Sequence, residues 1–189
     1  MQNTRISARY LIRFLAFSIL ALAVYRLVVP ALAMITIAPL TVLAPPLQAF
    51  REGAGAYFEW QGASRWVRFS HVNFEVVCAN FVVLTGLVLA TALPVWRRIE
   101  RLAIGFALLW VFNVLHLSAM LGYSYFQSEP PAPDATLLRL FNAVTTIAYH
   151  MGNQIGSMFL PLFVFLLVSL RQAPGSSEAA GVEEQSEIK

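Results

Sequence analysis

Long apolar runs alternate with short polar segments along this chain. Four of these runs approach the roughly 20 helical residues that cross a hydrocarbon core of ~30 Å. They are residues 12–29, 76–93, 102–123 and 151–170. The pattern predicts an all-α polytopic membrane protein with about four transmembrane helices.

The first run is followed by a second apolar stretch, residues 31–44. One straight helix through both would be longer than a bilayer requires, and Pro30 stands between them. We therefore expect the first helix to break at Pro30. The second stretch, broken again at Pro39, Pro45 and Pro46, is expected to lie at the membrane surface or to be partly inserted.

A cleaved signal peptide is the alternative for the first run. Arg5 and Arg9 form a basic start, an apolar middle follows, and Ala31 and Ala33 are small enough for a cleavage site. Arg26 inside the apolar region argues against this interpretation.

Composition supports a membrane protein. Hydrophobic residues make up 58% of the chain and charged residues 12%, which leaves too little polar surface to cover a soluble globule. The net charge of +3 would suit nucleic acid binding in a soluble protein. Here most arginines stand at the ends of apolar runs, so we expect the lipid bilayer, and no nucleic acid, as a partner.

The arginines also predict an orientation. They precede the first run, fill the link between the second and third runs, and follow the fourth: Arg5, Arg9, Arg13, Arg97, Arg98, Arg101 and Arg171. By the positive-inside rule both termini face the cytoplasm. We expect a multi-pass protein of the cell's inner (plasma) membrane.

The segments between the runs predict smaller features. Residues 48–75 are rich in aromatic and turn residues and predict a small extracytoplasmic cap, with a short strand at 66–71. Residues 124–135 predict an extracytoplasmic loop, and 136–150 an interfacial amphipathic helix. The polar, acidic residues 172–189 predict a disordered cytoplasmic tail that follows a membrane domain.

Cys78 is the only cysteine, so it forms no internal disulfide. It stands near the start of the second run, where the positive end of a helix dipole favours a thiolate. An imidazole within hydrogen-bond reach would complete an arrangement for nucleophilic acyl transfer.

Two histidines are candidates for that base. Counted from the arginine-bearing end of each helix, Cys78 lies ~24 Å and His116 ~22 Å along the helix axis, and His150 lies ~31 Å along its own. Cys78 and His116 are thus expected at similar depth near the outer face, with His150 higher. The sequence indicates Cys78, His116 and His150 as the catalytic candidates of a site that faces the extracytoplasmic side.

These positions carry a resemblance to a known family. The residues Phe-Glu-Val-Val-Cys at 74–78, Phe-Asn-Val-Leu-His-Leu at 112–117, and His150 before a final apolar helix resemble the exosortase and archaeosortase family. The resemblance implies an exosortase-like membrane domain over residues 1–171. It also implies a cysteine protease or transpeptidase, a hydrolase-type enzyme that cuts C-terminal sorting signals of exported proteins.

Within that resemblance, Cys78 matches the family's nucleophile and His150 its histidine. The family's motif Asn-x-x-Arg reads Asn113 to His116 here, so the arginine expected to stabilise an oxyanion is replaced by a group that is largely neutral near pH 7. Residues 79–80 are Ala-Asn, where the family usually has Ser-Gly. Arg68 and Arg139 are both expected on the extracytoplasmic side and could replace the missing arginine.

Other functions fit the same residues. The chain is also consistent with a non-catalytic accessory of a protein-sorting system, in which His116 and Asn113 form hydrogen bonds between helices. A third possibility is a haem with His116 and His150 as axial ligands. The sequence has no paired cysteines and no Gly-rich phosphate loop, so we expect no metal site and, outside the haem alternative, no cofactor.

Overall fold

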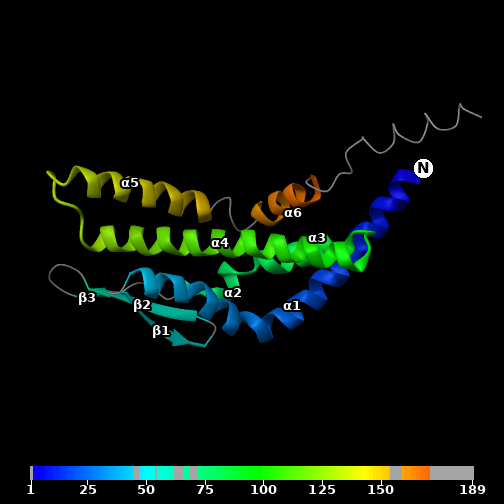
Figure 1. Cartoon of the computed structure of the whole chain (residues 1–189), viewed down its shortest axis with the longest axis horizontal. Coiled ribbons are helices and arrows are strands. Elements are labelled where there is room, and N and C mark those ends of the chain that lie inside the picture. The colour runs from blue at the N-terminus through cyan, green and yellow to red at the C-terminus, as the bar shows by residue number, and fades with distance from the viewer. Residues whose placement is uncertain are drawn as a thin grey trace, which may run out of the picture.

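The computed structural model describes residues 2–44, 47–53, 55–61, 66–68, 72–153 and 159–170. The chain is mostly helical and also contains a small sheet (Figure 1). His71 and the expected disordered tail, residues 172–189, lie outside the described residues.

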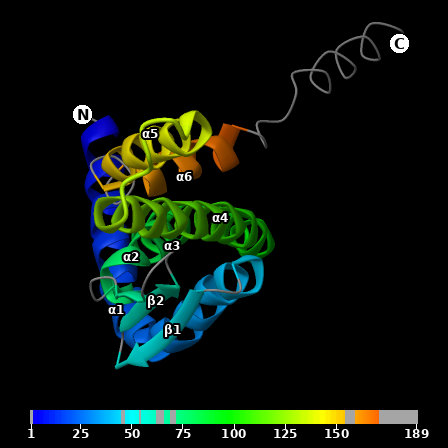
Figure 2. The same ribbon diagram turned by 90° about the vertical axis from the view of Figure 1, so that its left-hand side faces the viewer.

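The helices are α1 Gln2–Leu43, α2 Phe74–Val77, α3 Asn80–Ala90, α4 Val95–Ser128, α5 Thr136–Met151 and α6 Leu160–Leu170. The strands are β1 Leu47–Glu52, β2 Gly55–Gln61, β3 Trp66–Arg68 and β4 Val72–Asn73. Helix α4 lies at the centre, with α5 and α6 on one side of it and α1 and the sheet on the other (Figures 1 and 2). Helix α3 lies along the N-terminal half of α4 (Figure 1).

Helix α1 runs without interruption through Pro30 and Pro39. The expectation that it ends at Pro30 is therefore wrong. Proline removes one backbone hydrogen bond and crowds the preceding turn, which bends a helix when the flanking turns are held by packing. Val29 and Ala33 are buried on either side of Pro30, and α1 is bent (Figure 1). The second apolar stretch is thus helix and contributes to the core.

Helices α1 and α4 are each long and apolar enough to cross a membrane. The four spanning helices predicted from the sequence are not confirmed, because the other two apolar helices are shorter. One of them is divided into α2 and α3 by a break at Cys78 and Ala79, and the other, α6, has 11 residues. The central helix α4, by contrast, has 34 residues, or ~51 Å at 1.5 Å per residue, which is longer than a membrane span requires.

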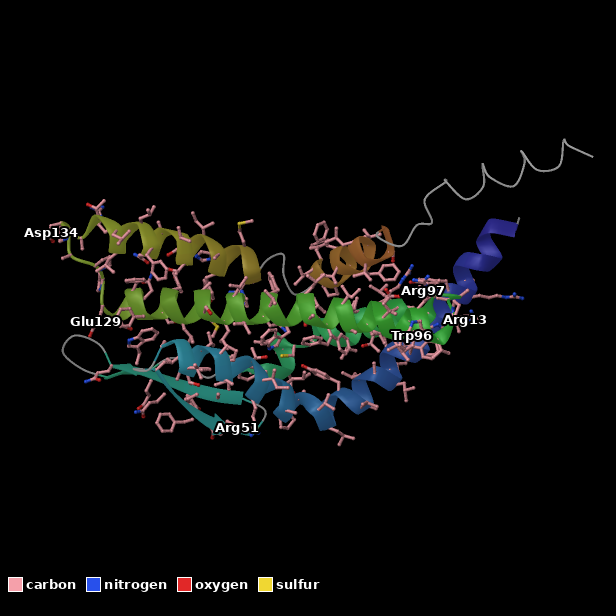
Figure 3. All side chains as sticks on the ribbon, viewed as in Figure 1. Arg13, Arg51, Trp96, Arg97, Glu129 and Asp134 are labelled. Carbon is pink, nitrogen blue, oxygen red and sulfur yellow. The ribbon has the colours of Figure 1, made fainter. Side chains whose placement is uncertain are left out.

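Large apolar side chains cover much of the outer surface. They are exposed on α1, α4, α5 and α6, as Leu27, Leu115, Leu137 and Phe163 illustrate. An apolar surface of this extent is typical of contact with lipid or with a partner protein. Charged side chains gather toward the ends of the molecule, with Arg13 and Arg97 near one end (Figure 3).

The sheet is antiparallel and is built around β2, which pairs with β1, β3 and β4. Leu47, Ala56 and Phe58 are buried beneath it. Gly53, in the turn after β1, has φ +58°, a left-handed conformation that glycine adopts without strain. The small cap predicted from the sequence is therefore a sheet, and β3 falls within the strand expected at 66–71.

Helix α5 confirms the helix predicted over residues 136–150. It packs alongside the C-terminal half of α4, antiparallel to it (Figure 1), rather than across its end. Phe126 meets Phe141 edge-on with the ring centroids 6.0 Å apart. Closer to the middle of α4, a Cβ on Gly122 would lie 2.9 Å from Thr145. Small residues at such crossings let two helix backbones approach closely.

Gly86 supports the same kind of close contact between α3 and α1. An added Cβ there would collide with the Ser18 hydroxyl and lie 3.1 Å from Phe14. We expect Gly86→Val to lower the free energy of unfolding by about 1–3 kcal/mol, the usual cost of overpacking. Ala103→Val, on an exposed face of α4, is the matched control. Equal thermal unfolding of both variants in detergent would contradict the close contact of α1 and α3.

Candidate functional site

Two buried asparagines join α3 to α4. Asn80 Nδ2 donates to Asn113 Oδ1 over 2.9 Å, and Asn113 Nδ2 donates back to Asn80 Oδ1 over 3.4 Å. Asn80 is 3% exposed and Asn113 1%. Each amide supplies the donor and the acceptor that the other requires, so the pair is stable where water has little access.

Cys78 lies beside this pair. It caps the C-terminus of α2, its side chain is fully buried, and Asn113 Nδ2 approaches its Sγ to 3.8 Å. The buried hydroxyl of Thr36 on α1 is a second hydrogen-bond partner of the thiol. The sulfur therefore links α1, the α2–α3 junction and α4.

Tyr25 connects the same junction to α1. Its hydroxyl donates to the backbone oxygens of Phe74 and Glu75, over 3.0 and 3.1 Å. Asn73 caps the other end of α2, accepting a hydrogen bond of 2.9 Å from the Glu75 amide. The short helix that presents Cys78 is thus held at both ends.

A cavity of about 340 Å³, the polar cavity, borders the asparagine pair. Its polar lining comes from β4, α3, α4 and the segment after α5: Asn73, Asn80, Asn113, His116 and Asn153. The rest of the described lining is apolar (Val72, Val76, Val77, Phe112, Met120 and Gly152), and the described lining contains no carboxylate or guanidinium. Cys78 is absent from that described lining, although Asn113 touches both the sulfur and the cavity.

His116 lies one turn after Asn113 on α4. Its ring stacks on Phe112 with the centroids 5.9 Å apart, and the Asn153 side chain interacts with it. A Cβ on Gly152 would collide with the ring at Nδ1, so only glycine fits there. Nδ1 is buried and has no hydrogen-bond partner within the described part of the chain.

The structure places His150 away from this group. It is exposed at the end of α5, where its ring meets Tyr123 and Tyr149 edge-on with centroid distances of 5.6 and 5.2 Å. It does not appear in the described lining of the His116 cavity. The structure therefore brings Cys78 into contact with Asn113 and places Asn113 and His116 along one cavity, and the described lining of that cavity does not include His150.

This placement does not suit a haem between the two histidines. Axial ligation requires both imidazoles to face one shared gap. His116 directs Nδ1 at the Gly152 backbone, whereas His150 packs among tyrosines. We derive no chemistry from a haem here.

The two arginines considered as replacements for the missing cation are not found in the described lining of the cavity. Arg139 lies more than three turns of α5 from Gly152, and it donates to the backbone oxygen of Pro133 over 3.4 Å. The side chain of Arg68 lies outside the described residues. No described arginine therefore faces the cavity beside Cys78.

Thr36, Tyr25 and Asn153 were not singled out from the sequence, and Asn80 was noted only as a departure from a family pattern. A signal was present, because Asn80 and Thr36 each interrupt an apolar run. Polar groups in such runs often form hydrogen bonds to neighbouring helices. Their partners depend on how the helices pack, which the runs themselves do not encode.

Comparison with known proteins finds no family model, curated protein or solved structure that this chain matches.

The asparagine pair predicts a coupled effect on stability. Asn80→Ala and Asn113→Ala each leave one buried amide without its partner, so each should lower the free energy of unfolding by about 1–3 kcal/mol. The double variant should lose less than the sum, with a coupling energy of about 0.6–1.7 kcal/mol. Gln127→Ala, at an exposed position of α4, is the control and should have little effect. Additive losses in denaturant titrations would show that the two amides act independently.

Proposed function

We propose that this chain is a membrane-embedded, non-catalytic accessory of a protein-sorting system, with an exosortase-like arrangement of helices. The observation that carries the proposal is the complete burial of the Cys78 side chain between Thr36 and Asn113. The resemblance at residues 74–78 and 112–117 supports the link to protein sorting.

A catalytic cysteine has two geometric requirements that this thiol does not meet. The reacting carbonyl carbon has to approach the sulfur to ~3–3.5 Å, and a base has to lie within hydrogen-bond reach. The described partners of the sulfur are an amide and a hydroxyl, neither of which is a base at neutral pH. A buried thiolate would also lack a cation in contact, so the neutral thiol is the form that fits.

The polar cavity offers binding without cleavage. Amide side chains donate and accept hydrogen bonds in the same way as a peptide backbone, so the exposed Asn73 and Asn153 suit an extended segment of an exported polypeptide. The His116 ring adds one further polar group to the cavity lining. In this proposal the accessory holds the sorting signal of its client, and the chemistry occurs elsewhere.

The membrane position follows from the two ends of α4. Tyr123 lies ~33 Å along α4 from Arg101, close to the ~30 Å thickness of a hydrocarbon core. Tyr123 stacks on Tyr149 with centroids 4.5 Å apart, and tyrosines are enriched at membrane interfaces. We place Arg101 at the cytoplasmic face of the inner membrane and the cavity near the extracytoplasmic face.

A cysteine transpeptidase is the second candidate, because Asn113 contacts Cys78 and also lines the cavity, with His116 one turn away. Rotation of the Asn113 side chain would open a path between the sulfur and the cavity. In an enzyme this open state has to be populated, whereas in the accessory it need not be.

Thiol reactivity distinguishes the two candidates. We expect Cys78 in native membranes to react with a permeant maleimide at least ~10²-fold more slowly than after unfolding in detergent, because modification requires opening of the buried site. Glu75→Cys in a Cys78→Ala background, an exposed position on the same short helix, is the control. It should react at once, and from outside the cell with an impermeant reagent.

A sorting assay completes the test. If the chain is an accessory, Cys78→Ser should preserve the processing of client proteins, whereas deletion of the chain should abolish that processing. Rapid native labelling of Cys78 together with loss of processing in Cys78→Ser would reject the accessory and establish the transpeptidase.

A further inference from the structure

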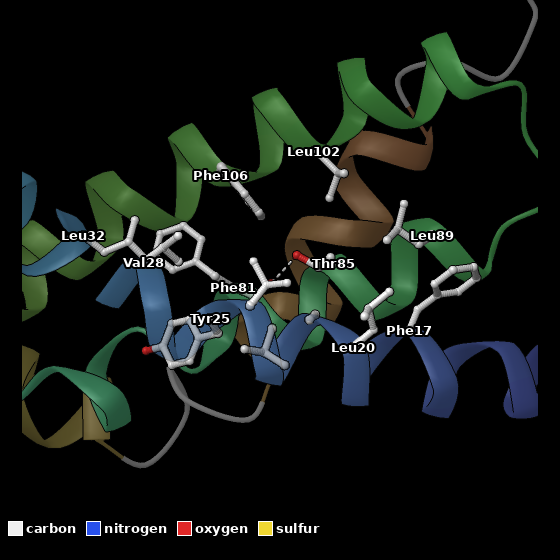
Figure 4. A pocket seen from close by; sticks show the side chains of 13 residues that line it. Phe17, Leu20, Tyr25, Val28, Leu32, Phe81, Thr85, Leu89, Leu102 and Phe106 are labelled. Carbon is white, nitrogen blue, oxygen red and sulfur yellow. Dashed lines mark hydrogen bonds between the residues drawn. The ribbon is translucent and has the colours of Figure 1, made fainter. Parts of the chain in front are cut away.

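An apolar groove of about 530 Å³ lies between α1, α3 and α4, on a different set of side chains from the polar cavity (Figure 4). Thirteen described residues line it, and all except Tyr25 and Thr85 have side chains made only of hydrocarbon. Exposed apolar residues surround it on α1. The groove is therefore open to an apolar ligand that approaches from within the membrane.

The two polar groups of the lining are already satisfied. The Thr85 hydroxyl donates to the Phe81 backbone oxygen over 2.7 Å, and the Tyr25 hydroxyl donates to the backbone oxygens at the end of α2. No hydrogen-bonding group in the described lining remains for a ligand inside the groove. Its contents have to be hydrocarbon.

The groove runs from Leu32 to Phe17 along α1, and Phe17, Leu89 and Leu102 lie together at one end (Figure 4). This is the arginine-bearing end of the molecule, where Arg13 and Arg97 also lie (Figure 3). The hydrocarbon surface of the groove thus leads directly to a cluster of cations.

Helix periodicity places two of these cations in line with the groove. Residues four apart occupy one face of a helix. Arg13 precedes Phe17 by four residues on α1, and Arg98 precedes Leu102 by four on α4. Each arginine therefore continues a row of groove residues by one turn beyond the groove's end.

Arg98 has unused hydrogen-bonding capacity. Arg98 Nε is buried and has no hydrogen-bond partner within the described part of the chain. Arg97, by contrast, pairs with Glu100 over 3.3 Å, and Arg101 donates to Ser169 over 3.2 Å. A guanidinium is suited to binding a phosphate through two parallel hydrogen bonds.

We infer that the groove and its two terminal arginines form a binding site for one anionic glycerophospholipid. An acyl chain lies in the groove between α1, α3 and α4, and the phosphate lies between Arg13 and Arg98 at the level of the headgroups. Positive groups between helices at a membrane face recognise anionic lipid headgroups in this manner. The site is independent of the polar cavity and of any role in protein sorting.

The test uses the full chain in uncharged detergent and counts bound lipid by native mass spectrometry. The probes are phosphatidylglycerol and phosphatidylcholine with the same acyl chains. Arg13→Gln and Arg98→Gln should each weaken phosphatidylglycerol binding about fivefold, since one arginine near the surface contributes ~1 kcal/mol. Binding of phosphatidylcholine should stay unchanged. Arg97→Gln, which removes a paired and exposed arginine, should change neither by more than about twofold.

The acyl-chain half of the site has its own variant. Ala21→Phe fills the groove and should weaken both lipids, whereas Ala103→Phe on an exposed face of α4 should leave both unaffected. Glycerol 3-phosphate, which has the headgroup chemistry without chains, should not compete at the same concentration. Should Ala21→Phe fail to fold, the arginine variants and the glycerol 3-phosphate competition still decide the matter.

Three results would overturn the inference. Equal affinity for the two lipids would remove the charge preference, and unchanged phosphatidylglycerol binding in the Arg13→Gln, Arg98→Gln double variant would remove the phosphate contact. Disulfide-linked dimers of Val24→Cys that exclude lipid would assign the groove to a second copy of the chain.

Discussion

The reciprocal hydrogen bonds of Asn80 and Asn113 are the contact on which the rest of the arrangement depends. Inside an apolar bundle an unpaired amide has no water to replace its partner, so the two side chains lock α3 and α4 into one register. That register sets where Cys78 stands, because Asn113 also donates to its sulfur. The register also fixes the position of one wall of the polar cavity, at the level where α2 gives way to α3 and where α5 ends.

The interruptions of the helices and the polar side chains of α4 lie at the same level of the bundle. The break between α2 and α3 and the end of α5 at Gly152 both face the middle of α4, where Asn113 and His116 stand one turn apart. Irregular backbone inside a membrane is tolerated where it is buried in protein or lines a cavity. Below this level α1, α3 and α4 present hydrocarbon as far as the arginines. The polar cavity and the apolar groove thus occupy separate parts of one bundle.

Much of this architecture could be predicted from the sequence, and the failures have physical causes. The apolar runs correctly indicated a mostly helical chain, of which two helices are long and apolar enough to span a membrane, and residues 48–75 contain a small sheet. Pro30 was misjudged because flanking burial at Val29 and Ala33, a tertiary effect, keeps α1 helical. Counting along helices predicted a similar depth for Cys78 and His116. It could not show that Asn113 contacts the sulfur, since which side chains meet across a bundle depends on helix rotation.

The protonation and accessibility of the one thiol test the central claim most directly. Since Cys78 is the only cysteine, the S–H stretching band in an infrared spectrum of the full chain reports on this side chain alone. A buried, hydrogen-bonded thiol predicts an S–H band at neutral pH that is lost in Cys78→Ala and exchanges with D₂O only when the protein unfolds. An absent band at neutral pH, or exchange as fast as that of a cysteine introduced at Glu75, would contradict the account.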